Sequence, residues 1–254
     1  MKARILGCGT SSGVPRIGND WGACDPAEPR NRRSRVSIIV ESATTRILVD
    51  TSPDMREQLL AADVASADAV IWTHDHADHC HGIDDLRQLF HAAGRPVAGY
   101  ARVDTLASLT ARFAYAFHGR GSYPATVEGR ALPDRLMIGD IAVAVIDQPH
   151  GSITSAGLIF AHDDKKIIYS TDFNIIIDEM LIGYEGADLW IVDALRERPH
   201  PTHSDLATTL AAIRKVTPRL AVLTHMDQSM DYQALAAKLP ERVIPGHDGL
   251  DIWV

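Results

Sequence analysis

The feature that most restricts the fold of this 254-residue chain is a polar turn that follows an apolar run. Residues Ala69 to Trp72 predict a buried strand, and residues 73 to 79 then read Thr-His-Asp-His-Ala-Asp-His. Three imidazoles and two carboxylates crowded past a buried strand are costly unless they bind something. Imidazole and carboxylate groups are ligands for Zn²⁺ and its first-row neighbours. The turn therefore predicts a metal site built on His74, His76, Asp78 and His79.

The same arrangement recurs where other predicted strands end. Apolar runs are followed within a few residues by His150, by Asp172 and by His225. Each of these alone is an ordinary polar residue at a strand terminus. Strand ends on one edge of a sheet converge, however, so these three residues and the turn form one set. Together they supply seven candidate ligands, which is enough for two divalent ions.

The spacing of apolar residues predicts an α/β fold. Strand-like and helix-like stretches are mixed along the chain, and some neighbouring strands resemble hairpins, so neither a purely parallel sheet nor an all-β sandwich fits. Two mixed sheets with helices outside fit better. The predicted helices are 53–62, 84–93, 103–113, 204–216 with Ser204 as cap, and 232–239.

Nothing in the sequence divides the chain into separate units. It has no low-complexity segment, charge run or linker, so residues 1–254 are expected to form a single domain. The region from Ala114 to Leu136 is rich in Gly, Pro and Tyr. We predict that this region is irregular and forms a loop over the site.

Composition restricts the compartment and the partners. The formal charge of −8 argues against nucleic acid as a partner. Three cysteines, Cys8, Cys24 and Cys80, are too few and odd in number for a disulfide framework and indicate a reducing compartment. The N-terminal apolar run is too short for a signal peptide, and no segment approaches the ~20 apolar residues of a membrane span. A soluble, cytoplasmic protein with no membrane partner is expected.

The chain resembles the metallo-β-lactamase superfamily from the opening Ile5-Leu6-Gly7-Cys8-Gly9-Thr10-Ser11-Ser12-Gly13-Val14-Pro15 to Pro245-Gly246-His247-Asp248-Gly249. The resemblance implies an αββα sandwich, in which two mixed β-sheets are flanked by helices. It implies two divalent ions, with a hydroxide between them as the nucleophile and Asp78 orienting or deprotonating that water. In this scheme the first ion is held by His74, His76 and His150, the second by Asp78, His79 and His225, and both by Asp172.

The opening and the segment Pro201-Thr202-His203-Ser204 resemble the phosphodiesterase branch, which includes the cyclic phosphodiesterases of the carbon–phosphorus lyase pathway. This resemblance implies a small phosphate ester or nucleotide as substrate, of the phosphoribosyl 1,2-cyclic phosphate or 2′,3′-cyclic nucleotide type. It matches His203 to an additional histidine that contacts the substrate. This catalytic residue would donate a proton to the leaving alkoxide or stabilise the transition state. Without the resemblance, His203 is equally well a polar residue beside a helix cap.

Other polar residues have weaker interpretations. Members of that branch can carry a cysteine-rich zinc site in the early loop, which is not expected here because the loop keeps only Cys24. His81 and His200 match no position of the family and are expected at the surface or behind the ligands. The Arg30 to Arg35 cluster either steers a phosphate substrate or is a solvated loop.

Several functions share the same metal residues. A tRNA 3′-processing endonuclease is disfavoured by the acidic charge, and a thioester or lactone hydrolase by the match at His203. A non-catalytic accessory protein, like that of similar fold in pyrroloquinoline quinone biosynthesis, tends to lose ligands, whereas all seven positions are filled here. The ligand set suits Zn²⁺, Mn²⁺ and Fe²⁺ alike, and a homodimer is implied only by the resemblance.

Overall fold

Apolar side chains alternate along the first strands and so reach two different cores. In the computed structural model, which describes all residues from 1 to 254, strand β3 (Arg46–Val49) places Ile47 and Val49 in a 43-residue core shared by the two sheets. Its intervening residue, Leu48, lies in a 17-residue core on the opposite face of its own sheet. Successive side chains of a strand point to opposite faces, so an uninterrupted apolar run predicts a sheet that is covered on both sides.

Fourteen strands form two seven-stranded sheets, which confirms the predicted fold class. In the first sheet the strands from β14 to β3 are antiparallel neighbours, and those from β3 to β6 are parallel. Its order is β14 (Asp251–Trp253), β1 (Lys2–Gly7), β2 (Ser37–Glu41), β3, β4 (Ala69–Ile71), β5 (Val97–Ala101) and β6 (Val127–Ala131).

The second sheet has the same mixture of directions. Strands β10 to β13 are parallel neighbours, whereas β7 to β10 are antiparallel. Its order is β13 (Val243–Pro245), β12 (Leu220–Thr224), β11 (Leu189–Asp193), β10 (Lys165–Ser170), β9 (Ile153–His162), β8 (Ile141–His150) and β7 (Arg135–Ile138).

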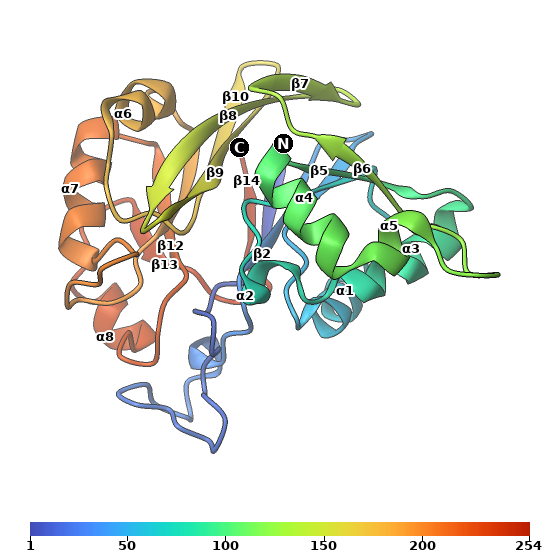
Figure 1. Cartoon of the computed structure of the whole chain (residues 1–254). Helices are drawn as coiled ribbons and strands as arrows, with labels where there is room; N and C mark the ends of the chain where they lie inside the picture. Colours follow the sequence, from blue (N-terminus) through green and yellow to red (C-terminus); the bar gives the residue numbers. More distant parts are fainter.

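Helices cover the outer faces of both sheets (Figure 1). Four of them, α1, α3, α4 and α5, lie on the side of the first sheet, and α6, α7 and α8 lie on the side of the second. The longest, α7, has 11 residues, and none is long and apolar enough to cross a membrane. The helices are α1 (Met55–Ala62), α2 (Ala77–Cys80), α3 (Leu86–Ala93), α4 (Val103–Arg112), α5 (Ala114–His118), α6 (Asp178–Tyr184), α7 (Leu206–Val216) and α8 (Tyr232–Ala236), with 3₁₀ turns η1 (Pro29–Asn31) and η2 (Ile83–Asp85).

The prediction of an irregular loop from Ala114 to Leu136 is wrong for most of the region, although residues 119–126 are irregular. This region forms α5, the edge strand β6 and the start of β7. Phe117 of α5 packs on Trp72, with ring centroids 6.2 Å apart, so the segment helps to build the outer core of the first sheet. The sequence does not reveal the edge strand β6, because only its first residue, Val127, is buried. The strand therefore shows no alternation of apolar residues.

Candidate metal centre

The loops after four strands bring the predicted ligands to one place between the sheets. His74 follows β4, His150 ends β8, Asp172 follows β10 and His225 follows β12. Asp78 and His79 lie in α2, the single helical turn after β4. Three groups of candidate ligand atoms result, each with all of its atoms within 4.8 Å of one another. The first group is His74, His76, His150 and Asp172, the second is Asp78, His79 and His225, and the third is Asp172, Asp193, His203 and His225.

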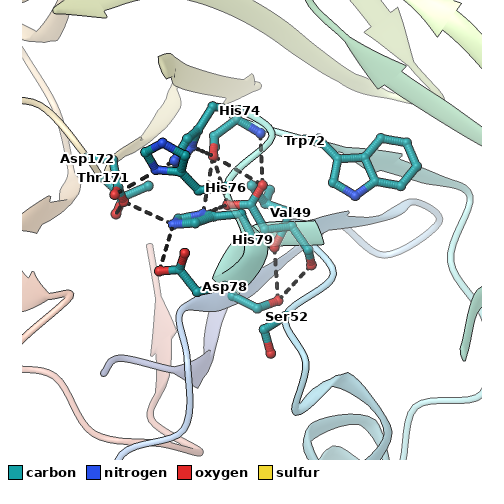
Figure 2. Close-up of polar contacts among 12 residues, drawn as sticks. Val49, Ser52, Trp72, His74, His76, Asp78, His79, Thr171 and Asp172 are labelled. Carbon is teal, nitrogen blue, oxygen red and sulfur yellow. Dashed lines mark hydrogen bonds and ion pairs between the residues drawn. The ribbon is translucent and has the colours of Figure 1, made fainter. Parts of the chain in front are cut away.

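Asp172 belongs to the first and third groups and also lies beside the second. Its Oδ1 atom is 3.8 Å from His74 Nε2 and 3.7 Å from His150 Nε2, while its Oδ2 atom is 3.2 Å from His79 Nε2. Figure 2 shows His79 between this carboxylate and that of Asp78, which is 3.5 Å from the same nitrogen. The position of Asp172 thus agrees with the bridging role that the resemblance implies.

Backbone geometry turns several of these side chains into the centre. Asp172 and His225 both have left-handed conformations, with φ of 54° and 57°, although neither is a glycine. Asp50, directly after β3, has a φ of 60°. Non-glycine residues with positive φ are uncommon, and they concentrate at functional sites. Three strands of this chain therefore end in the same unusual turn beside the candidate metal residues.

Contacts behind the candidate ligands fix which ring nitrogen faces the centre. His79 Nδ1 donates to the buried carboxylate of Asp50 at 2.7 Å, and His150 Nδ1 donates to the carbonyl oxygen of Thr202 at 2.7 Å. Asp50 also accepts a hydrogen bond from the amide of Thr73 at 2.8 Å. Such partners leave Nε2 free to bind and hold the ring in place.

Asp50 was missed by the sequence analysis, although its signal is present. It follows the apolar run 46–49 just as His225 follows 220–223. The rule that strands end in site residues therefore extends to residues that support the candidate ligands.

Two buried imidazole nitrogens indicate that the cluster can hold a metal ion. The Nε2 atoms of His74 and His79 are buried and have no hydrogen-bond partner, which is rare because an unsatisfied buried polar atom is costly. Both atoms point into the cluster with Asp172. The donor set of imidazole nitrogen and carboxylate oxygen is therefore compatible with divalent metal ions.

The histidines of the first and second groups differ in the direction of their pKa shifts. Burial lowers the pKa of His74 and of His150 and favours their neutral forms. Burial opposes charge on His225 as well, but the neighbouring carboxylates, Asp172 foremost, raise its pKa to about 9. Burial favours the acid form of Asp172, yet the imidazoles around it hold its pKa well below the usual range. The cluster thus keeps a carboxylate beside buried imidazoles, as metal binding requires.

His203 lies at the edge of the same cluster. Its Nδ1 atom donates to Asp193 Oδ2 at 3.0 Å, and its ring stacks on His225 with centroids 4.7 Å apart and planes inclined by 14°. Asp193, the last residue of β11, is buried and was not predicted from the sequence. The prediction that Ser204 caps the next helix is wrong: Asp205 caps α7 and accepts from the amide of Thr208.

The remaining histidines and the cysteines lie outside the cluster. His81 Nε2 is 2.8 Å from an Arg112 guanidinium nitrogen, and His200 Nδ1 accepts from the amide of Thr202. The three cysteine side chains, Cys8, Cys24 and Cys80, are buried, and burial raises the pKa of each thiol.

The arginine cluster is largely paired within the chain. Arg30 pairs with Glu28 at 2.7 Å, and Arg35 pairs with Asp54 at 3.0 Å. Arg33 is buried and donates to the backbone carbonyl of Asp227 at 3.2 Å. The arginine side chains therefore stabilise the early loop through contacts within the chain.

The two seven-stranded sheets and the His/Asp cluster are those of a metal-dependent hydrolase of the metallo-β-lactamase fold. The sequence model of the beta-lactamase superfamily domain matches residues 45–226, and the chain belongs to this superfamily. Within it the chain resembles the PhnP family. The crystal structure of a diphosphatase from that family superposes with a TM-score of 0.91 at 32% identity, and the match covers 100% of this chain and 97% of that one.

Two further proteins that the chain resembles have different names. Zn²⁺-bound PqqB from Methylobacterium extorquens has a TM-score of 0.81 at 18% identity over all of both chains, which shows the fold alone. A protein named octanoyltransferase from Porphyromonas gingivalis is 32% identical over 259 residues. That match takes in 99% of this chain but 51% of the relative, so the chain spans about half the length of the curated relative it matches.

Proposed function

We propose that this hydrolase is a phosphodiesterase that binds two divalent ions and cleaves a small cyclic phosphate or nucleotide. The observation that carries the proposal is the position of His203, which is hydrogen-bonded to Asp193 and stacked on His225 at the edge of the cluster. An imidazole oriented in this way beside a metal centre is suited to proton donation. Hydrolysis of a carbonyl compound by the candidate metal residues alone would not need such a proton donor.

The cluster divides into two binding sites in this proposal. His74, His76 and His150 would hold one ion, Asp78, His79 and His225 the other, and Asp172 both. When bound, two such ions lower the pKa of a water molecule and offset negative charge on a phosphoryl oxygen. Asp78, which is largely buried, would orient the attacking water.

His203 would act on the other side of the phosphorus. Because its Nδ1 atom is held by Asp193, the free Nε2 atom would carry the proton to the leaving oxygen. Water attacks phosphorus and gives one proton to Asp78, one P–O ester bond breaks, and the leaving alkoxide takes a proton from His203. A cyclic ester thereby opens to one product that carries a hydroxyl group and a phosphate monoester. The buried Asp193 stabilises the protonated imidazole before the transfer.

A second candidate is hydrolysis of a phosphoanhydride, which is favoured by the 32% identity to a PhnP-family diphosphatase. The two reactions differ in the leaving group. A phosphate leaves with little help from an acid, whereas an alkoxide requires a proton. Replacing His203 should therefore impair cleavage of a cyclic ester much more than cleavage of a diphosphate.

Octanoyl transfer through a cysteine has no support in the site. A thiolate acceptor must be accessible and of low pKa, whereas burial raises the pKa of the three cysteine thiols here. The name of the Porphyromonas protein belongs to a chain about twice as long.

The decisive experiment compares substrates on metal-loaded protein. Phosphoribosyl 1,2-cyclic phosphate, 2′,3′-cyclic nucleotides, bis(p-nitrophenyl) phosphate, inorganic diphosphate, pre-tRNA and an octanoyl thioester are assayed side by side. We expect turnover of the small diesters. His203→Ala should lower turnover of the cyclic diesters by about 10²-fold or more at unchanged metal content, and should lower turnover of bis(p-nitrophenyl) phosphate less, because p-nitrophenolate leaves with little help from an acid. The control is His91→Ala, an exposed histidine on α3. Turnover of only the thioester or only pre-tRNA would overturn the proposal.

A further inference from the structure

A groove of about 640 Å³ lies beside the candidate metal centre and is formed by three segments. Asp75 comes from the turn between His74 and His76, and Pro149 and Gly151 flank His150. The third wall is the first turn of α4, with Asp104 and Thr105. Two walls of the groove are thus the same backbone segments that carry candidate metal ligands. His76, the candidate ligand that follows Asp75, is exposed.

The lining of the groove is polar and acidic. Three carboxylates, those of Asp75, Asp104 and Asp147, face a single cation, Arg102. Hydroxyl groups of Thr105, Ser152 and Thr154 line the rest, and only one of the ten lining residues is hydrophobic. A volume in this range suits a small-molecule moiety, but an apolar occupant does not match this lining.

Arg102 does not make the groove a phosphate site. Its Nε and Nη2 atoms donate to Asp147 at 2.8 and 3.1 Å, its Nη2 atom pairs with Asp134 at 2.9 Å, and its Nη1 atom donates to the carbonyl oxygen of Leu132 at 2.9 Å. Two carboxylates therefore offset its charge. The net negative groove disfavours a second phosphate, so the 5-phosphate of phosphoribosyl 1,2-cyclic phosphate would have to lie outside it, and it repels a continuing nucleic-acid strand.

We infer that this groove binds the hydroxyl-rich, uncharged part of the substrate, a ribosyl or nucleoside group, while its phosphate lies at the metal centre. Carboxylate oxygens accept hydrogen bonds from sugar hydroxyls, as acidic residues do with ribose in dinucleotide sites. Threonine and serine hydroxyls add donors and acceptors. Asp75 is engaged, because Ser108 Oγ donates to its carboxylate and Arg112 Nη1 pairs with it at 3.5 Å. Asp104, Thr105 and Thr154 are therefore the residues that would set specificity.

This inference rests on the proposed function, and its first test uses pairs of substrates. The kcat/KM value of adenosine 5′-(p-nitrophenyl phosphate), whose ribose keeps its 2′- and 3′-hydroxyl groups, is compared with that of bis(p-nitrophenyl) phosphate, which has the same leaving group and no sugar. In Asp104→Ala or Thr105→Val the value for the nucleotide ester should fall about tenfold more than the value for bis(p-nitrophenyl) phosphate, mainly through KM. Asp164→Ala, in the exposed turn after β9, is the acidic control. An equal fall for both substrates would overturn the inference.

A binding measurement separates this inference from the proposed function. Metal-loaded protein is titrated with ribose 5-phosphate and with inorganic phosphate, and neither requires turnover. We expect ribose 5-phosphate to bind more tightly than phosphate in the wild type, and Thr105→Val and Asp104→Ala to remove most of that difference. Thermal melting of each variant excludes unfolding. Equal affinities in the wild type, or a difference that survives both substitutions, would overturn the groove assignment even if the diesters are cleaved.

Discussion

Asp193 Oδ2 lies 3.0 Å from His203 Nδ1, and the same oxygen accepts the backbone N–H of Asp172 at 3.1 Å. One buried carboxylate thus ties the proposed proton donor to the proposed bridging residue. The arrangement resembles an imidazole–carboxylate pair in a catalytic triad, in which the carboxylate fixes the ring and stabilises its charged form.

Asp193→Ala should lower kcat on a cyclic diester by about 10²-fold or more, because His203 loses its orientation and the partner of its positive charge. Asp193→Asn should fall between the wild type and the alanine variant. An amide oxygen can still accept from His203 and from the Asp172 amide, but it carries no charge. Steady-state kinetics with circular dichroism as a folding check would measure this. Equal rates in all three proteins would show that Asp193 does not position the histidine.

The sheets and the clustering of the candidate metal residues could be predicted because each depends on local sequence. A polar residue just past an apolar strand is visible in the chain, and parallel neighbours bring such residues together. The contact between His203 and Asp193 is different. It joins a loop residue to a strand end, and only the pairing of β11 between β10 and β12 decides that these two meet.

Replacing Asp50 should weaken metal binding, although Asp50 is not itself a candidate ligand. Its carboxylate holds His79 Nδ1 at 2.7 Å, and loss of such a partner lowers metal affinity by about 10–100-fold. The test is Asp50→Asn, with affinity measured by competition with a chelator. Asp163→Asn is the matched control, because both positions have positive φ, 60° and 53°, which asparagine tolerates. Affinity in Asp50→Asn equal to that of the control would contradict this role.

The left-handed turns at Asp50, Asp172 and His225 could not be predicted from the sequence. Their backbone conformation is imposed by the surrounding sheets and is not encoded by a glycine or a turn motif. The sequence therefore identifies these residues as strand ends but does not predict the direction of their side chains. The edge strand β6 was missed for a related reason, since its pairing with β5 compensates for weak local signals.

Chelation should destabilise the protein as well as inactivate it. The unpartnered Nε2 atoms of His74 and His79 gain partners only when an ion binds, and an ion at about 1,000 times its Kd stabilises the folded state by about 4 kcal/mol. We expect elemental analysis to find about two ions per chain, and Tm to fall after chelation and recover with added Zn²⁺ or Mn²⁺. Fewer than one ion per chain, or a Tm indifferent to chelator, would contradict the dinuclear assignment.

Asp248 should make stability depend on pH between about 4 and 6. Burial raises its pKa from 3.8 to about 6, although Ser34 and the amide of Cys8 donate hydrogen bonds to it. The folded protein therefore holds this proton more tightly than the unfolded chain, so the contribution of Asp248 to the unfolding free energy is greatest at low pH. It declines as the pH rises through 6 and becomes constant about one pH unit above that value. The difference between the two pKa values corresponds to about 3 kcal/mol at 1.36 kcal/mol per pKa unit.

The measurement for this effect is urea unfolding from pH 4 to pH 7 of wild type and Asp248→Asn at the same metal loading. The asparagine variant loses a hydrogen bond, because its amide nitrogen cannot accept from Cys8 or Ser34, so its overall stability is expected to be lower. The informative quantity is the difference between the two proteins, which should change by about 2 kcal/mol between pH 4 and pH 6 and level off near pH 7. A change of more than about 1 kcal/mol between pH 6 and pH 7 would assign the titration to other groups.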